Sequence, residues 1–218
     1  MSGKVNPKKL NRIFAYRGLQ TISGVCLAVV LTLFAVTVSA QNAMSSNRLT
    51  PLSSGKPDAM AKIEVFYDLQ CPSCANLHSI LMGVEKKFGV DIFITFRHFP
   101  LRIPAHDKAF TAAKMVEAAH VQGKGRQMLD LILTNQKSWT ANKRARTIFF
   151  GYATALRLNM PQFREDYENE ETIYRIVDDL FKVKELKLNS TPTFFLNGKQ
   201  LTFIEALDIE TKIKEILK

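Results

Sequence analysis

Several protein classes are excluded by what this 218-residue sequence has little of. Three cysteines are too few for a disulfide-dense scaffold. Ten glycines and eight prolines are too few for collagen or a low-complexity chain. Because 46% of the residues are hydrophobic, wholesale disorder is excluded as well. No repeat of fixed period is visible, which argues against a solenoid. The length favours one domain, or one domain with an insertion.

The first forty residues contain no acidic side chain and hold half of the excess positive charge. The formal net charge is +10, from 30 Lys and Arg against 20 Asp and Glu. Five of those basic side chains precede residue 41, so the remaining 178 residues carry 25 basic and 20 acidic groups. A domain with that balance is only mildly basic, and we expect no nucleic-acid partner.

The same forty residues have the pattern of a targeting segment. A basic stretch at residues 4–17 precedes an apolar run at 25–38, and the small residues at 38–40 suit a signal peptidase. The apolar run has about the length of a signal-peptide core and is short for a membrane span. We expect residues 1–40 to be either a cleaved signal peptide or a retained N-terminal membrane anchor. Either one would export the remaining chain to the periplasm or cell envelope.

Beyond this leader the sequence predicts a flexible linker followed by one domain. Residues 41–58 are polar and contain Ser, Asn and Pro, which is typical of a linker, so we place the domain at 59–218. Residues 63–67 and 90–99 have the composition of strands, and 74–88 between them have helical apolar spacing. The order strand, helix, strand favours a parallel pair with a right-handed crossover.

The sequence of the second half of the domain predicts a block of helices followed by a hairpin. Residues from about 105 to 188 show helical stripes, and this segment is too long for a mere loop. Asn197-Gly198 is a strong hairpin signal after the apolar run 193–196, and 204–217 form a last amphipathic helix. The predicted fold is therefore α/β, a mixed sheet flanked by helices with a helical insertion at about 105–188.

Two cysteines remain beyond the leader, Cys71 and Cys74, with Pro72 and Ser73 between them. An even pair in an oxidising compartment is expected to react together. The first cysteine falls where a helix begins after a strand, and free N–H groups and the helix dipole stabilise a thiolate there. We predict that Cys71 is the exposed, attacking sulfur and that Cys74 is tucked into the first turn. Pro72 suits that turn because a missing N–H costs nothing at its first position.

Two other roles for the cysteine pair stay open. A Cys-x-x-Cys is also half of a zinc site, and His78 lies four residues after Cys74, but no second such pair exists. A structural disulfide is the other possibility, although closing a four-residue loop contributes little to stability. The sequence has no GxGxxG and no P-loop, so we expect no organic cofactor, and no metal is assigned.

Three spaced motifs resemble those of the DsbA-like thiol–disulfide oxidoreductases of the thioredoxin superfamily. The motifs are FYDLQCPSC at 66–74, RHFPL at 97–101 and TPTFFLNGK at 191–199. The similarity covers about residues 60–218 and implies a thioredoxin-like fold. It also implies that Pro192 is cis and lies against the cysteine pair, and that a substrate chain adds as a short strand beside Thr191. Thr191 and Pro192 are thus predicted to support the active site, together with Pro72 and Ser73.

The chain departs from the family at three places, one of which is Ser190, in place of the glycine common before the Thr-Pro pair. Pro-Ser stands between the cysteines where the best-known strong oxidases have Pro-His, which leaves the oxidising strength open. Many members carry a buried acid six residues before the first cysteine, where this chain has Val65. Strand alternation predicts that the neighbouring Glu64 points to the opposite face, and we expect Asp68 to be an exposed loop carboxylate.

The resemblance implies an exported thiol–disulfide oxidoreductase that forms or exchanges disulfide bonds in other exported proteins through Cys71 and Cys74. Unfolded or reduced exported proteins are the expected clients. A membrane partner, most simply a quinone-linked DsbB-like oxidase, would recycle the pair. The alternative of the same fold is a reductase or isomerase. The alternative from another class is a non-catalytic, membrane-attached binding protein on a thioredoxin scaffold.

Overall fold

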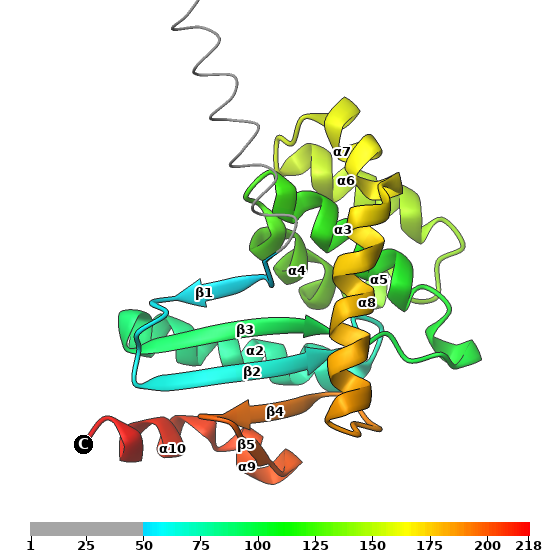
Figure 1. Ribbon diagram of the computed structural model, residues 1–218. Helices are drawn as coiled ribbons and strands as arrows, with labels where there is room; N and C mark the ends of the chain where they lie inside the picture. Colours follow the sequence, from blue (N-terminus) through cyan, green and yellow to red (C-terminus); the bar gives the residue numbers. More distant parts are fainter. Residues whose placement is uncertain (1–49) are drawn as a thin grey trace, which may run out of the picture. The chain divides into compact units, whose positions relative to one another are not determined.

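The computed structural model describes residues 50–218, and the predicted leader at 1–40 lies outside the described residues. The described chain forms a five-stranded sheet in the order β1-β3-β2-β4-β5 (Figure 1). The strands are β1 (Ser53–Gly55), β2 (Ala61–Tyr67), β3 (Ile92–His98), β4 (Thr193–Leu196) and β5 (Lys199–Leu201). Because β2 pairs parallel with β3 and antiparallel with β4, the predicted mixed sheet is confirmed.

Helices cover the sheet and form a separate block beyond it (Figure 1). The crossover from β2 to β3 is α2 (Pro72–Phe88), followed by the 3₁₀ turn η2 (Gly89–Asp91). The segment between β3 and β4 contains η3 (Pro104–His106), α3 (Ala109–Val121), α4 (Gly125–Thr134), α5 (Gln136–Trp139), α6 (Ala145–Ala155), α7 (Met160–Glu168) and α8 (Glu170–Glu185). The chain ends with α9 (Phe203–Leu207) and α10 (Ile209–Ile216). No helix among residues 50–218 is long and apolar enough to span a bilayer.

The central strand β2 has apolar side chains on both faces because both faces are covered. Val65 and Tyr67 belong to the large core that includes residues of α2, whereas Phe66 packs with Val183 of α8 in a smaller cluster on the opposite face. In Figure 1, α8 crosses the carboxyl ends of β2 and β3. This covered end of the sheet is where α2 begins, so residues that follow β2 lie at a junction of several elements.

The first part of the predicted flexible linker at 41–58, up to residue 49, lies outside the described residues. The prediction is wrong at its end, because Ser53–Gly55 form the edge strand β1. β1 pairs antiparallel with β3, and the carbonyl of Leu52 accepts a hydrogen bond of 2.8 Å from Phe96 N. The polar composition of this segment did not indicate a strand. Its pairing satisfies backbone N–H and C=O groups of β3 that would otherwise have no partner in the sheet. Leu52 anchors it in the core, and Gly55 has a φ of +90°, which favours glycine.

The predicted hairpin is confirmed between β4 and β5. Asn197 and Gly198 both have positive φ, +48° and +79°, as a two-residue turn of this type requires. The last predicted helix is divided into α9 and α10 at Asp208, and Thr202 caps α9 in a reciprocal arrangement with Glu205. The last helical segments therefore begin at a defined cap directly after the hairpin.

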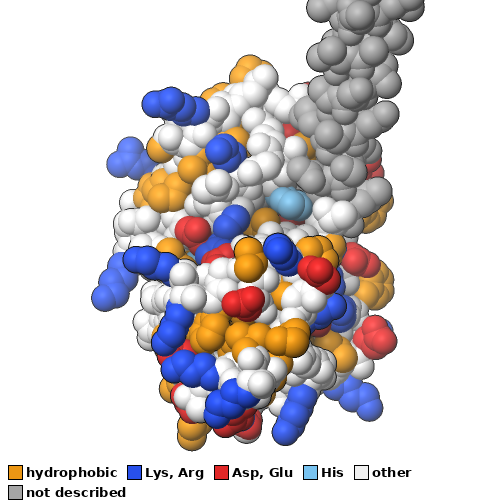
Figure 2. Space-filling view, turned by 90° about the vertical axis from the view of Figure 1, so that its left-hand side faces the viewer, with side chains coloured by type: hydrophobic (Ala, Val, Ile, Leu, Met, Phe, Trp, Pro, Cys, Tyr) orange, Lys and Arg blue, Asp and Glu red, His pale blue; other side chains and the backbone are white. Residues whose placement is uncertain are grey.

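Basic and acidic side chains are interspersed with hydrophobic ones on the face of the molecule in Figure 2. No large patch of one charge sign is visible on that face. The distribution is what the nearly balanced composition beyond residue 40 predicts.

Trp139 is the largest fully buried side chain of the helical block, and its replacement should measure how much this block contributes to stability. Its ring packs edge-on against Phe149 with centroids 5.0 Å apart, and its Nε1–H donates to the Ile132 carbonyl at 2.8 Å. We predict that Trp139→Ala lowers the free energy of unfolding by about 3–5 kcal/mol, measured by urea denaturation. Tyr174→Ala, at a mostly exposed aromatic of α8, should change it by less than about 0.5 kcal/mol. An equal loss in both variants would contradict the assignment of Trp139 to the core.

Candidate active site

The two cysteines lie at the start of α2, directly beyond the carboxyl end of β2. Cys71 is the N-cap residue, with extended backbone angles, and Pro72 occupies the first turn. The carbonyl of Cys71 accepts the first helical hydrogen bonds, from Cys74 N at 3.1 Å and Ala75 N at 3.3 Å. Cys74 is fully buried, as predicted. Cys71, predicted to be exposed, is also buried, with 8% of its surface accessible to solvent. Pro72 is exposed and Ser73 half-buried, so the outer side of the pair is formed by Cys71 and this dipeptide.

The surroundings push the pKa values of the two thiols in opposite directions. The hydrogen bond from the Cys74 thiol is the main cause that lowers the pKa of Cys71 from 9.0 to about 5. Burial opposes this shift, and the Cys74 and Ser73 N–H groups and the Thr191 side chain reinforce it. Burial raises the pKa of Cys74 well above its ordinary value, and the neighbouring Cys71 adds to the effect. At neutral pH the reduced site therefore pairs a Cys71 thiolate with a Cys74 thiol.

Thr191 and Pro192, far away in sequence, lie against the cysteine pair. The Thr191–Pro192 peptide bond is cis, and Cys71 Sγ is 3.6 Å from the carbonyl oxygen of Thr191. The Thr191 hydroxyl is buried and forms no hydrogen bond among the described residues. The structure thus brings together Cys71, Cys74, Thr191 and Pro192 as the sequence motifs predict.

Asp68 is fully buried, and the prediction of an exposed carboxylate was wrong. Its Oδ1 accepts from Gln70 N at 2.7 Å, and its Oδ2 accepts from Leu101 N at 2.8 Å and lies 2.7 Å from His106 Nδ1. A carboxylate with this many partners can be buried without a prohibitive cost. Asp68 therefore ties the loop before Cys71 to the segment after β3. A turn in which an Asp side chain bonds the N–H two residues on is the local signal that could have indicated it.

Gln136 of α5 braces the same loop from the helical block, and nothing in the sequence singled it out. Its Nε2 donates to the carbonyls of Leu69 at 2.8 Å and Cys71 at 2.9 Å. Both bonds are buried, so they satisfy two carbonyls that water cannot reach. Gln70 makes a third brace, since its side chain bonds the Ala105 carbonyl and the Lys108 N–H.

The prediction for Glu64 is confirmed, because its carboxylate lies on the face of β2 opposite to Cys74. It accepts from Arg97 Nε at 2.8 Å and from Lys182 Nζ of α8 at 2.9 Å. Val65 is completely buried in the core beside the cysteines. The position of the family's buried acid is thus occupied by an aliphatic side chain, and Glu64 does not replace it.

The residues considered for a zinc site do not converge. No three His, Cys, Asp or Glu side chains between residues 50 and 218 lie close enough together to hold a metal ion. The ring of His78 instead places Nε2 at 2.8 Å from Asp130 Oδ1.

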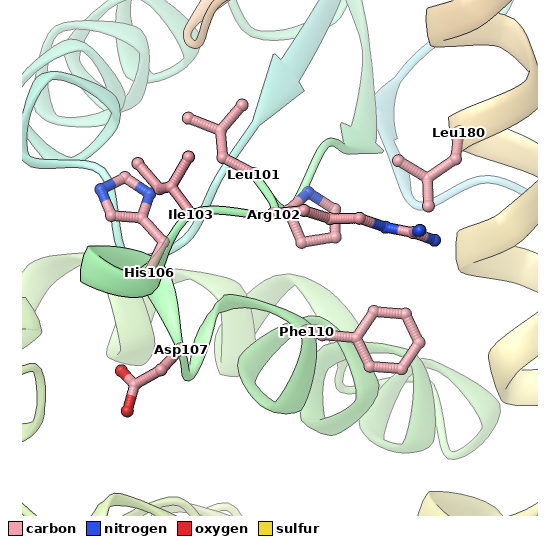
Figure 3. Close-up of a pocket in the computed structure, with 8 residues that line it drawn as sticks. Leu101, Arg102, Ile103, His106, Asp107, Phe110 and Leu180 are labelled. Carbon is pink, nitrogen blue, oxygen red and sulfur yellow. The ribbon is translucent and has the colours of Figure 1, made fainter.

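A cavity of about 340 Å³ lies between the segment after β3 and α8, next to the loop that Asp68 holds (Figure 3). Apolar side chains from both walls face it, with one guanidinium and one carboxylate at its rim. The lining residues are Pro100, Leu101, Arg102, Ile103, His106, Asp107, Phe110 and Leu180. Since His106 also contacts Asp68, the cavity and the cysteine loop share a wall.

Comparison with known proteins agrees with this geometry. Residues 47–216 match the family described as Thioredoxin, and the chain belongs to that family. BdbD from Bacillus subtilis, in its oxidised form, superposes with a TM-score of 0.64 at 19% identity, over 77% of this chain and 92% of BdbD. Alpha-DsbA1 from Wolbachia pipientis gives 0.62 at 20% identity, over 79% of this chain and all of that one. The fold is the thioredoxin-like fold of the DsbA-like thiol–disulfide oxidoreductases, as the motifs predict.

A segment of a much longer protein is also similar in sequence. The chain is 33% identical over 150 residues to a protein named Na(+)/H(+) antiporter NhaA 1 from Mycolicibacterium gilvum. That match covers 67% of this chain and 23% of the antiporter, so the chain spans less than a quarter of the relative's length. The similarity is therefore that of one domain.

The low pKa of Cys71 should be visible as a thiolate transition near pH 5. We predict that the absorbance of the reduced protein at 240 nm, which reports thiolate, rises with a midpoint at about pH 5. The transition should be missing in Cys71→Ser. A midpoint between pH 8 and 9 in the unmodified protein would contradict the assigned environment.

The same shift makes the stability of the reduced protein depend on pH. The pKa of Cys71 in the folded protein, about 5, lies below its ordinary value of 9.0. The contribution of the Cys71 thiolate to the free energy of unfolding is therefore complete above pH 9 and is lost as pH falls through 5. The difference in unfolding free energy between the reduced protein and reduced Cys71→Ser should therefore grow from pH 5 to pH 9. Urea denaturation at pH 5, 7 and 9 measures it, and a difference that is constant or shrinks would contradict the sign.

Proposed function

We propose that this protein is an exported thiol–disulfide oxidoreductase that forms or exchanges disulfide bonds in other exported proteins. The observation that carries the proposal is the asymmetry of the pair. The Cys71 sulfur has a pKa of about 5 and keeps a small accessible surface, whereas Cys74 is fully buried and its pKa is raised. Burying one thiol and stabilising the other as a thiolate serves thiol–disulfide exchange and has no evident use in a purely structural disulfide.

The proposed reaction begins with the Cys71–Cys74 disulfide. A client thiolate attacks Cys71 Sγ, the bond between the two sulfurs breaks, and Cys74 leaves and takes up a proton. The client is then joined to Cys71 by a mixed disulfide. A second client thiolate attacks the client's sulfur, and Cys71 leaves as a thiolate. The client is oxidised by two electrons and the cysteine pair is reduced. The low pKa of Cys71 makes it a good leaving group in this last step.

The backbone at Thr191, beside the Cys71 sulfur, offers a place for a client chain to bind. Thr191 stands next to Cys71 and precedes β4, so an extended client chain can add beside it as a short strand. The cavity in Figure 3 offers apolar contacts on the other side of the loop. Strand-like binding of this kind requires an extended client, which favours unfolded or reduced exported proteins.

A recycling partner completes the proposed cycle. Each turnover leaves the pair reduced, so an oxidant must accept two electrons, and a quinone-linked, DsbB-like membrane oxidase is the simplest candidate. Export to the periplasm or cell envelope is proposed on the basic and apolar pattern of residues 1–40.

Replacing each cysteine separately tests the proposal. We predict that the oxidised protein, residues 41–218, restores the disulfides of reduced, unfolded ribonuclease and that Cys71→Ser abolishes this activity. Cys74→Ser should also fail to oxidise reduced ribonuclease, but its Cys71 thiolate should attack a disulfide of scrambled ribonuclease and release one client thiolate. The mixed disulfide that forms should accumulate, seen by non-reducing electrophoresis and mass spectrometry.

The matched control is Ser79→Ala, which removes a hydroxyl from the exposed side of the same helix and should change nothing. Unchanged disulfide transfer in Cys71→Ser would refute the oxidoreductase proposal. It would leave the binding-protein alternative in its place.

A further inference from the structure

Cys74 has to gain and lose a proton in every cycle, and nothing in the described site so far supplies one. This inference rests on the proposed function. Cys74 is fully buried, and burial raises the pKa of its thiol, so the thiolate that leaves Cys71 needs a proton donor inside the protein. Val65 stands where relatives carry a buried acid, and Glu64 bonds Arg97 on the other face. Neither of these two residues is therefore placed to supply the proton.

Two polar side chains face the same core as Cys74. His78 follows Cys74 by four residues in α2, so both lie on one face of the helix. Tyr67 ends β2, belongs to the same core cluster, and packs edge-on against His78 with ring centroids 5.7 Å apart. Only 1% of each residue is exposed. The Cys74 charge is the second cause, after burial, that raises the pKa of Tyr67 well above 10, so its hydroxyl stays neutral.

Each of these side chains has one polar atom without a partner. Tyr67 Oη and His78 Nδ1 are buried and form no hydrogen bond within residues 50–218. Buried polar atoms are rarely left in that condition, and a site with several of them typically binds an ordered water. A tyrosine hydroxyl and an imidazole nitrogen beside a buried thiol are together able to hold one.

The opposite edge of the imidazole is connected to solvent. His78 Nε2 lies 2.8 Å from Asp130 Oδ1 of α4, and 27% of the Asp130 side chain is exposed. Arg126 donates to the same carboxylate at 2.9 Å and also bonds Glu85 of α2. Burial opposes a lowered pKa of Asp130, but His78 and Arg126 prevail and lower it. Asp130 is thus an ionised acceptor that orients the imidazole ring. Because part of its side chain is exposed, it also connects the ring to solvent.

The imidazole of His78 is surrounded by side chains from β2, β3 and α4. β2 contributes Tyr67, and β3 contributes the ring of Phe96, whose centroid is 6.4 Å from that of His78. The Arg126 guanidinium lies over this Phe96 ring at 4.9 Å. Asp130 therefore balances the charge of the Arg126 guanidinium.

We propose that His78 is the proton relay of Cys74, acting through a water that the Tyr67 hydroxyl positions. When the disulfide is attacked and the Cys74–Cys71 bond breaks, His78 Nδ1–H gives its proton through the water to the Cys74 thiolate. The ring is then neutral and keeps its Nε2–H on the Asp130 carboxylate. When the pair is reoxidised, the Cys74 thiol returns its proton to Nδ1 as its sulfur attacks Cys71. His78 gives and takes protons, and Tyr67 is a positioning residue.

Oxidation of the reduced protein by glutathione disulfide tests the relay and the proposed function in two different reaction steps. In the first step the Cys71 thiolate attacks the reagent and releases one glutathione. In the second step Cys74 loses its proton and attacks Cys71 Sγ, and the second glutathione leaves. Rapid mixing, acid quenching and mass spectrometry at pH 5.5–8.5 give the rate of each step. If the first step does not occur, the proposed function fails, whatever the role of His78.

The decisive variant is His78→Gln, because glutamine can still hydrogen-bond Asp130 but cannot carry a titrating proton. We expect its second step to be at least ten times slower at pH 7, since general acid–base catalysis typically contributes about 10²–10⁴-fold. We also expect the rate to rise tenfold per pH unit, as hydroxide takes over, whereas the unmodified protein shows a flatter profile. The first step should stay within twofold. A second step with unchanged rate and pH profile would overturn the relay.

Tyr67→Phe tests the positioning role without changing the shape of the core. Removing only Oη should slow the second step three- to tenfold and leave the first step unchanged, and an unchanged second step would remove Tyr67 from the path. Tyr152→Phe is the matched control, because Tyr152 Oη bonds Ser138 in the helical block. His120→Gln, at the end of α3, is the control for His78→Gln. If His78→Gln fails to fold, as judged by circular dichroism, the comparison of the two tyrosine variants decides.

Discussion

The hydrogen bond from the buried Cys74 thiol to the Cys71 thiolate is the interaction on which the proposed chemistry depends. It is the main cause that brings the pKa of Cys71 to about 5, and it can exist only while Cys74 keeps its proton. Burial keeps the Cys74 thiol protonated because it raises the pKa of that thiol. The two shifts therefore support each other, and both follow from the position of one sulfur at a helix N-cap and of the other one turn inside the core.

The rest of the structure holds this pair in place. Asp68 fastens the loop before Cys71 to the segment after β3, and Gln136 reaches the same loop from α5. The helical block thus contributes directly to the site, since one of its side chains bonds the Cys71 carbonyl. Thr191 closes the site from the segment before β4. Elements that are far apart in sequence converge at the carboxyl end of β2, where α/β proteins commonly place their sites.

Sequence patterns predicted the parts of the fold and site that depend on local chemistry. The hairpin at Asn197-Gly198 and the cysteine pair at a helix start were visible because turn residues and helix termini have local requirements. The burial of Asp68, the brace from Gln136 and the strand β1 were missed. Gln136 and β1 depend on partners in distant segments, for which the sequence has no local signal. Asp68 has one local partner, Gln70 N, but its other partners are also distant.

The reduction potential of the Cys71–Cys74 pair, measured by equilibrating residues 41–218 with glutathione buffers, tests the central claim most directly. A stabilised Cys71 thiolate favours the reduced form, so the potential should lie well above that of thioredoxin, about −270 mV, and near those of disulfide donors. A potential at or below that of thioredoxin would contradict a stabilised thiolate and would favour a reductase. A pair that glutathione cannot reduce at all would point to a structural disulfide.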